Sequence, residues 1–462
     1  MSTPTPAAPG GVTGSPAPGK VQHGSGSAWE PFVWSAIGLA LIAGFGLGGV
    51  LFAAPALGLP VGVWAAAAQV HGHIQLFGWA GLMVLGVGLH FLPRLRGRPL
   101  ARPCHAHTAV VLLVAGLVLR SVAQPLVTLN SQTVMSTLLR AALGLSGVLE
   151  LAGATLVVGL LLVTARGAPP LRTRPGFLQV SPFLVTAFAA FWLALVVNLV
   201  AVIGAALMGT GLIDSGVDGL TVLLALNGFV LPIAVGMGAR IFPLHFASGQ
   251  PNLRALRGGL VCLLVGLALR VAGELAAAPF MTALGLVSTA LAYVLFVLGL
   301  QVFAPRRRVA GTRKVWFRDA AQWHGLSAFV WLLLDAGLLL LEATNLLLHS
   351  SGGSLLEIDR HILGAGFITL LILGEGANLL PGFGAGPLRS EALVWATLVF
   401  GNAAALLRVG PVLLPGLLPG QAGELALALS GLAGVLAVAL LSLNLRGRRV
   451  PKGVEARLAD AR

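Results

Sequence analysis

Two histidines lie in apolar stretches of the chain, and each occupies the same position in a repeated pattern. His73 lies twenty residues before Pro93, and His361 lies twenty residues before Pro381. A neutral imidazole offers one ring-nitrogen lone pair, so imidazoles at equal depth on two facing helices can take the two axial positions of a haem iron. The residue types and their spacing therefore predict a haem site with His73 and His361 as the iron ligands.

The repeated pattern has three copies, each reading glycine and an aromatic residue, then Gly-x-Gly, then proline. Small residues let helix backbones approach closely within lipid, and self-similar units pack against their copies. Packing alone would explain the glycines and prolines, but not the two histidines, for which the middle copy has Leu223. The copies are Gly78-Trp79, Gly86-x-Gly88 and Pro93; Gly228-Phe229, Gly236-x-Gly238 and Pro243; and Gly366-Phe367, Gly374-x-Gly376 and Pro381.

A second histidine, His71, precedes His73 by two residues. At about 100° of rotation per residue, the two side chains point to nearly opposite sides of a helix, so only one of them can face a given cofactor. The repeat favours His73, because it matches His361. His71 is then a neighbour of the site, a hydrogen-bond partner or a ligand of a second site.

The elements that must position these side chains are membrane-spanning helices. Of the 462 residues, 57% are hydrophobic and 10% are charged, which excludes a soluble globular protein. Apolar stretches of about 20 residues can each cross a roughly 30 Å hydrocarbon layer. Twelve are expected, near residues 32–55, 63–92, 107–129, 138–165, 181–210, 219–243, 256–275, 279–303, 322–348, 359–381, 391–413 and 421–445.

The predicted fold is an all-α integral membrane protein of three four-helix arcs, because the repeat falls on helices two, six and ten. Residues 1–28, rich in proline, glycine and serine, are expected to form a disordered cytoplasmic tail. Residues 29–446 form the predicted transmembrane domain, and residues 447–462 a basic cytoplasmic tail.

The net charge of +14 is explained by orientation rather than by nucleic-acid binding. Arginines cluster in alternate loops, and cationic loops stay in the cytoplasm. Every even-numbered helix is therefore predicted to end inside, with both termini cytoplasmic. The clusters are Arg94, Arg96, Arg98 and Arg102; Arg166, Arg172 and Arg174; Arg254 and Arg257; Arg306, Arg307, Arg308, Arg313 and Lys314; Arg389; and Arg446, Arg448 and Arg449.

Several other polar side chains are candidates for a role at such a site. Haem propionates are anionic and attract cations, which the outer helix ends supply as Arg120, Arg140, Arg270 and Arg408. An ion pair of Arg270 with Glu274, four residues along, is the alternative for that arginine.

Near the predicted cytoplasmic side, imidazole and thiolate groups are candidate copper or zinc ligands, and His324 at the start of helix nine is the one most worth testing. Carboxylates within apolar spans could form a proton path or be paired, buried residues. The first set is His90, Cys104, His105, His107, His245 and His324, and the second is Glu150, Asp335, Glu342 and Glu375.

These motifs resemble two helices of the haem-copper oxidase catalytic subunit. The segment from His71 through Trp79 to Pro93 resembles its second helix, and the segment from His361 to Pro381 its tenth. The resemblance implies twelve helices in three arcs, with low-spin haem held from helices two and ten near the outer face. It also favours Arg408 on helix eleven as the propionate partner.

Departures from the oxidase pattern argue against its copper-containing centre. The oxidase histidine on helix six and the His-His pair at helix seven are absent, and Asp359 stands where a second haem ligand is expected on helix ten. The His-x-His-x-x-x-Phe-Gly segment from His71 to Gly78 is more similar to the NnrS family of bacterial membrane proteins, although Gln75 replaces an acidic residue.

The NnrS resemblance implies a bacterial inner-membrane protein that carries haem, taken to be b-type, together with copper. It links the protein to nitric oxide, as a ligand or substrate, and to nitrosative stress. Electrons would come from quinol or a cytochrome. Two alternatives remain: a divergent oxidase-like protein without the binuclear centre, and a secondary transporter or respiratory-complex assembly protein. A transporter is disfavoured, because the three repeats run in one direction rather than being inverted.

Overall fold

The computed structural model describes residues 28–53, 61–129, 134–305, 318–349, 355–384, 386–414, 416, 418 and 420–446. The predicted C-terminal tail and residues 1–27 of the predicted N-terminal tail lie outside the described residues. Every regular element within the described ranges is helical.

Twelve helices in the described part are long and apolar enough to cross a membrane, which confirms the predicted number. Four of these spans contain a π-helical segment. These four are span one, with α1 (Glu30–Leu39), a π-helical segment (Ala40–Gly44) and α2 (Phe45–Ala53); span two, with α3 (Val61–His73), a π-helical segment (Ile74–Gly81) and α4 (Leu82–Arg96); span six, with α8 (Ser215–Leu223), a π-helical segment (Leu224–Val230) and α9 (Leu231–His245); and span ten, with α13 (Leu356–His361), a π-helical segment (Ile362–Thr369) and α14 (Leu370–Leu379).

Each of the other eight spans is a single α-helix. Spans three to five are α5 (Cys104–Val127), α6 (Val134–Arg166) and α7 (Pro175–Met208), and spans seven to nine are α10 (Leu253–Leu275), α11 (Pro279–Leu300) and α12 (Ala320–His349). Spans eleven and twelve are α15 (Glu391–Leu413) and α16 (Gln421–Leu445).

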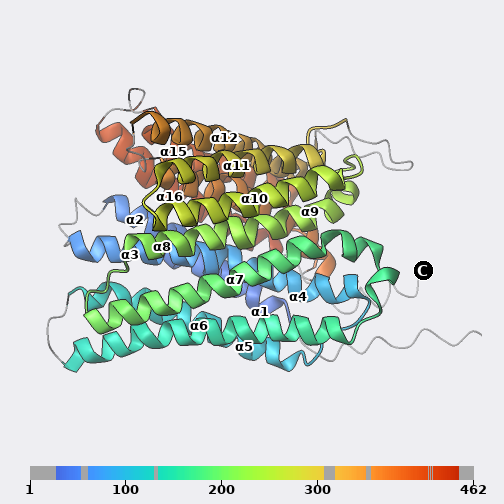
Figure 1. The fold of residues 1–462 in the computed structure, drawn as a ribbon. Helices are drawn as coiled ribbons and strands as arrows, with labels where there is room; N and C mark the ends of the chain where they lie inside the picture. The colour runs from blue at the N-terminus through green and yellow to red at the C-terminus, as the bar shows by residue number, and fades with distance from the viewer. Residues whose placement is uncertain are drawn as a thin grey trace, which may run out of the picture.

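The helices run side by side in one bundle (Figure 1). The outer surface of the bundle is rich in apolar side chains. Large hydrophobic side chains are exposed along it, including Val185, Val200 and Leu207 at 69%, 66% and 73%. A soluble protein does not expose so continuous an apolar surface, whereas a lipid-facing surface requires it. The protein is therefore a multi-pass membrane protein.

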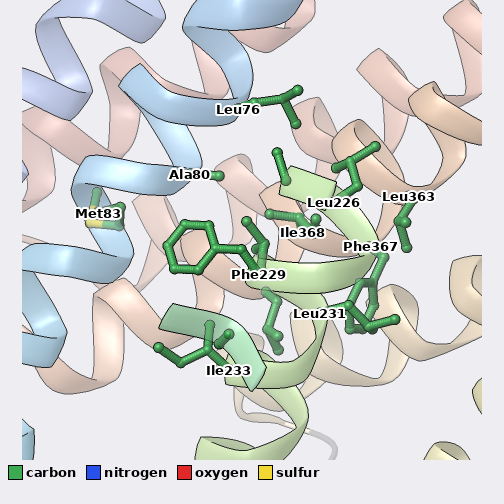
Figure 2. Packing of buried hydrophobic residues seen from close by; sticks show 14 of the residues in the cluster. Leu76, Ala80, Met83, Leu226, Phe229, Leu231, Ile233, Leu363, Phe367 and Ile368 are labelled. Atoms are coloured by element: carbon green, nitrogen blue, oxygen red, sulfur yellow. The ribbon is translucent and has the colours of Figure 1, made fainter. Parts of the chain in front are cut away.

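The three sequence repeats build the centre of the bundle. Each glycine-aromatic pair lies in a π-helical segment, and the segments of spans two, six and ten contact one another. Figure 2 shows Ala80, Phe229 and Ile368 from the three spans directed into one apolar core. A π-helical turn widens the helix and is common at functional sites. The repeat thus places three local distortions at one level.

The first glycine of each Gly-x-Gly lets the preceding span pack against the repeat. A Cβ atom there would approach the Cβ atom of a side chain on span one, five or nine, too closely to be accommodated without a shift. The distances are 3.0 Å from Gly86 to Phe32, 2.6 Å from Gly236 to Phe183, and 2.5 Å from Gly374 to His324.

The second glycine of each Gly-x-Gly faces a different environment. Gly88, Gly238 and Gly376 line a central cavity of about 120 Å³, enclosed by spans two, six and ten. Its lining is apolar apart from Glu375. The two glycines of each motif therefore have separate roles, one in helix packing and one in leaving central space.

Exchanging these two kinds of glycine for alanine should have opposite consequences. We expect Gly236→Ala to destabilise the protein by about 1–3 kcal/mol, because its methyl group would overpack against Phe183. Gly88→Ala should be neutral or stabilising by up to about 1 kcal/mol, because its Cβ atom meets only Leu92 at 3.7 Å and alanine favours helix. Denaturation of both variants in detergent checks this, and equal losses would contradict it.

The central spans divide the bundle into three sectors. Sector A is enclosed by spans two to six, sector B by spans six to ten, and sector C by spans ten, eleven, twelve, one and two. Helices that follow one another around each sector pack together, such as α5 with α6, α10 with α11, and α15 with α16. Because the three repeats are related by rotation about the centre of the bundle, equivalent residues on spans two, six and ten face successive sectors.

Candidate functional site

His361 and Arg408 lie together in sector C. The Nδ1 atom of His361 is 2.8 Å from the carbonyl oxygen of Glu357, one turn earlier in α13. Arg408 of α15 donates to the Glu357 carboxylate at 2.6 Å, and its guanidinium lies 4.5 Å from the centre of the Phe52 ring. Span eleven thus presents a cation at Glu357, the residue whose carbonyl oxygen is the partner of His361.

His71 faces the same sector. Its Nδ1 atom is 2.9 Å from the carbonyl oxygen of Gly44 in span one. Its ring packs so closely on Gly48 that a Cβ atom there would lie 2.6 Å from the imidazole Cε1. His71 and Arg408 both lie near enough to His361 for an electrostatic interaction, and Arg408 lies equally within reach of His71. His71, His361 and Arg408 therefore form one local group.

The donor set of this group fits a haem iron. With Nδ1–H donated to a backbone carbonyl, each imidazole keeps its lone pair on Nε2, which is the tautomer that a ligand needs. No hydrogen bond from the described residues reaches either Nε2 atom. His71, Gln75 and His361 are only half-buried although they lie between helices, and the buried Gln75 Oε1 has no partner there. Both imidazoles thus keep part of their surface accessible.

His73 lies in a different environment, in sector A. Its Nε2 atom is 2.6 Å from the carboxylate of Glu150 on α6, and its Nδ1 atom is 2.9 Å from Nη1 of Arg120 on α5. Arg120 also donates to Gln124 at 2.8 Å and to the amide oxygen of Asn198 on α7. Both ring nitrogens of His73 are thus engaged in a buried polar network.

The structure therefore separates His73 from His361 and brings His71 to it. The reason is the rotation of the repeats: the same position on spans two and ten faces sector A in one case and sector C in the other. A residue two positions earlier on span two turns back toward sector C. The predicted pairing of His73 with His361, based on matched positions, does not correspond to these contacts.

Sector B holds a third buried polar group. The Nη2 atom of Arg270 on α10 lies 3.9 Å from the carboxylate of Asp359 on α13, and Asp335 of α12 lies next to Asp359. Tyr293 of α11 donates to Asn227 of span six. The proposed Arg270–Glu274 pair is wrong, because Glu274 is exposed while Arg270 turns inward to span ten. Asp359 thus occupies sector B with a cation rather than a metal-ligand set.

Two other predicted candidates have local structural partners. His324 is fully buried, with Nδ1 2.9 Å from the carbonyl oxygen of Ala320 and Nε2 3.2 Å from the Thr397 hydroxyl. Arg140 donates to the last carbonyl groups of α7. Within the described ranges, no three His, Cys, Asp or Glu side chains come close enough to hold a metal ion. We therefore assign no copper ligand.

The predicted cytoplasmic histidines do not gather into one site. His90 stacks on Phe383 with ring centres 3.7 Å apart, and His105 contacts Cys104 at 3.3 Å. His245 is paired with Glu375 at 3.0 Å, at the edge of the central cavity. Glu150 and Asp335 belong to the groups of sectors A and B, so the four carboxylates do not form one path.

Comparison with known proteins identifies the fold. No protein-family model matches the chain, and no curated protein sequence matches it significantly. A solved structure, described as a haem-copper terminal oxidase dimer, superposes on 92% of this chain and 85% of its own, with a TM-score of 0.64 and 13% sequence identity. The chain therefore has the twelve-helix fold of haem-copper oxidase subunit I.

Proposed function

We propose that this protein is a divergent relative of the oxidases that binds one low-spin, b-type haem in sector C, with His71 and His361 as the axial ligands. One observation carries the proposal: on two facing spans, both imidazoles are fixed through Nδ1 to backbone carbonyls and keep Nε2 available. Backbone partners of this kind orient a metal-binding imidazole and set its tautomer.

Arg408 is assigned to the anionic edge of the haem. Its guanidinium is always charged and can hold a carboxylate through two N–H donors. Glu357 now accepts one of those donors, and its side chain is 69% exposed, so it can turn away when a propionate takes its place. Arg408 would thus anchor the group from span eleven while the two histidines hold its iron.

When bound, haem would supply a one-electron carrier within the membrane. With both axial positions occupied by histidine, this site suits electron transfer from quinol or a cytochrome better than oxygen reduction. Sector B supports that choice, since its buried polar group is formed by Arg270, Asp335 and Asp359, and no group of three metal-binding side chains occurs among the described residues. The NnrS resemblance connects the electron transfer with nitric oxide, whose binding at the haem would require one histidine to leave.

The first test is the haem content of the purified wild-type protein. We expect about one non-covalently bound haem per chain, with the reduced-minus-oxidised spectrum of a low-spin b-type centre. Copper is quantified on the same sample and should be substoichiometric. Protein purified without haem, which also fails to take up added haem, would contradict the proposal and favour a transport or assembly role.

A further inference from the structure

A groove on the lipid-facing surface lies apart from all three buried polar groups. It has a volume of about 650 Å³ and follows α6 from Val148 to Val163, beside α7. Fifteen residues of helix at about 1.5 Å each give the groove a length of roughly 22 Å, longer than one leaflet of a roughly 30 Å hydrocarbon layer. Its length and position suit an extended acyl chain.

The groove is apolar along its length and cationic at one end. Thr155, a polar residue in its wall, has its hydroxyl satisfied by Leu151 and Trp192. Arg102 and His105 line the end near the start of α5, and both are exposed. This distribution matches an amphiphile that carries its charge at one end and hydrocarbon over the rest.

The charge required of that amphiphile is negative. Between Arg94 and Arg174 the sequence contains one acidic residue, Glu150, and it is buried against His73 in sector A. No carboxylate of the described residues pairs with Arg102. Arg102 also holds a backbone φ of +49°, a left-handed conformation uncommon outside glycine, at the turn that leads into α5. The turn thus presents an unneutralised guanidinium at the mouth of the groove.

We propose that this groove binds one anionic phospholipid, with its phosphate at Arg102 and His105 and one acyl chain along α6. A basic pocket between membrane helices recognises anionic headgroups, whereas the apolar wall accepts any acyl chain. The cations should therefore determine the preference for an anionic headgroup, and the groove should determine whether a lipid binds at all. The proposal is independent of haem binding.

Native mass spectrometry of the protein in neutral detergent, with equal amounts of phosphatidylglycerol and phosphatidylcholine, tests it. The first lipid retained by the protein should be phosphatidylglycerol about five times as often as phosphatidylcholine. This ratio corresponds to about 1 kcal/mol of binding free energy for one cation near the headgroup. Arg102→Gln should abolish the preference. The matched control is Arg257→Gln, which removes the same charge from the exposed start of α10 and should preserve it.

A second variant tests the groove itself. A Cβ atom at Gly159 would meet nothing within 4 Å, so Gly159→Leu fills the groove without disturbing the fold. It should remove the first retained lipid whatever its headgroup. Equal retention of the two lipids by the wild type, an effect of Arg102→Gln no greater than that of Arg257→Gln, or unchanged retention by Gly159→Leu would overturn the proposal.

Discussion

His71→Gln and His361→Gln should each purify without the low-spin haem spectrum, whereas His73→Gln should retain it. Glutamine keeps a side chain of similar length but offers no imidazole to the iron, so each of the first two changes removes an axial ligand. His73 lies in sector A, where its ring nitrogens contact Glu150 and Arg120, and glutamine can still donate an N–H to the carboxylate there. Haem content and the reduced-minus-oxidised spectrum of the three variants check this.

The three variants are matched, since each replaces a histidine by the same residue on span two or span ten. Circular dichroism and size-exclusion chromatography should show three folded proteins, which separates ligand loss from misfolding. Loss of haem in His73→Gln together with a retained spectrum in His71→Gln would restore the pairing by repeat position and refute the pairing by sector.

The second large effect is on stability, at the sector A network. Arg120 is 1% exposed and binds Nδ1 of His73, whose Nε2 binds the equally buried Glu150, so the Arg120 charge offsets that of the carboxylate across the imidazole. Removing the cation leaves an uncompensated buried carboxylate, so Arg120→Met should lower the free energy of unfolding by about 3–5 kcal/mol. Chemical denaturation in detergent measures the loss.

A double-variant cycle distinguishes charge compensation from simple loss of packing. In an Arg120→Met protein, Glu150→Met should cost about 2 kcal/mol less than it does alone, because the two groups interact. Arg140→Met is the matched control, since among the described residues that guanidinium bonds only to backbone carbonyls at the end of α7. This variant should lose about 1 kcal/mol. Additive losses, or a loss in Arg120→Met no larger than the control, would show that the network does not depend on charge.

The helices could be predicted from the sequence because their signal is local. Apolar length identified all twelve spans, and the repeat identified the three that meet at the centre. The ends were less accurate: span two was predicted to end at residue 92 but continues to Arg96. Pro93 lies within that helix, in its last turn. The π-helical segments of spans two, six and ten had no recognisable signal beyond the glycine-aromatic pairs that they contain, and the segment of span one contains no such pair.

The partners of the polar side chains could not be predicted from the sequence. They depend on how each helix is turned about its own axis, because this decides which sector a given side chain faces. Matching His73 with His361 by position assumed that equivalent residues face each other, as in a twofold arrangement. In a threefold arrangement, equivalent residues face successive sectors, and facing pairs come from positions two residues apart, as with His71 and His361. Knowing only that the repeat has three copies would have been enough to raise this alternative.

Sector B gives a second example of the same limit. Arg270 and Glu274 are four residues apart on one helix, which favours an ion pair. Burial changes the balance, because a guanidinium turned toward the interior needs an interior carboxylate, and Asp359 of span ten supplies it. Asp359 is far from Arg270 in the sequence, and no sequence pattern links the two residues.

The most direct test of the haem site is ligand replacement with His71→Met. A thioether can bind haem iron in place of an imidazole, and this exchange raises the reduction potential. If His71 and His361 hold the haem, the variant should keep its haem, change from bis-imidazole to imidazole–thioether ligation in its spectrum, and show a higher midpoint potential. Bound haem with an unchanged spectrum and potential would mean that His71 is not a ligand, and would contradict the assignment of the haem to sector C.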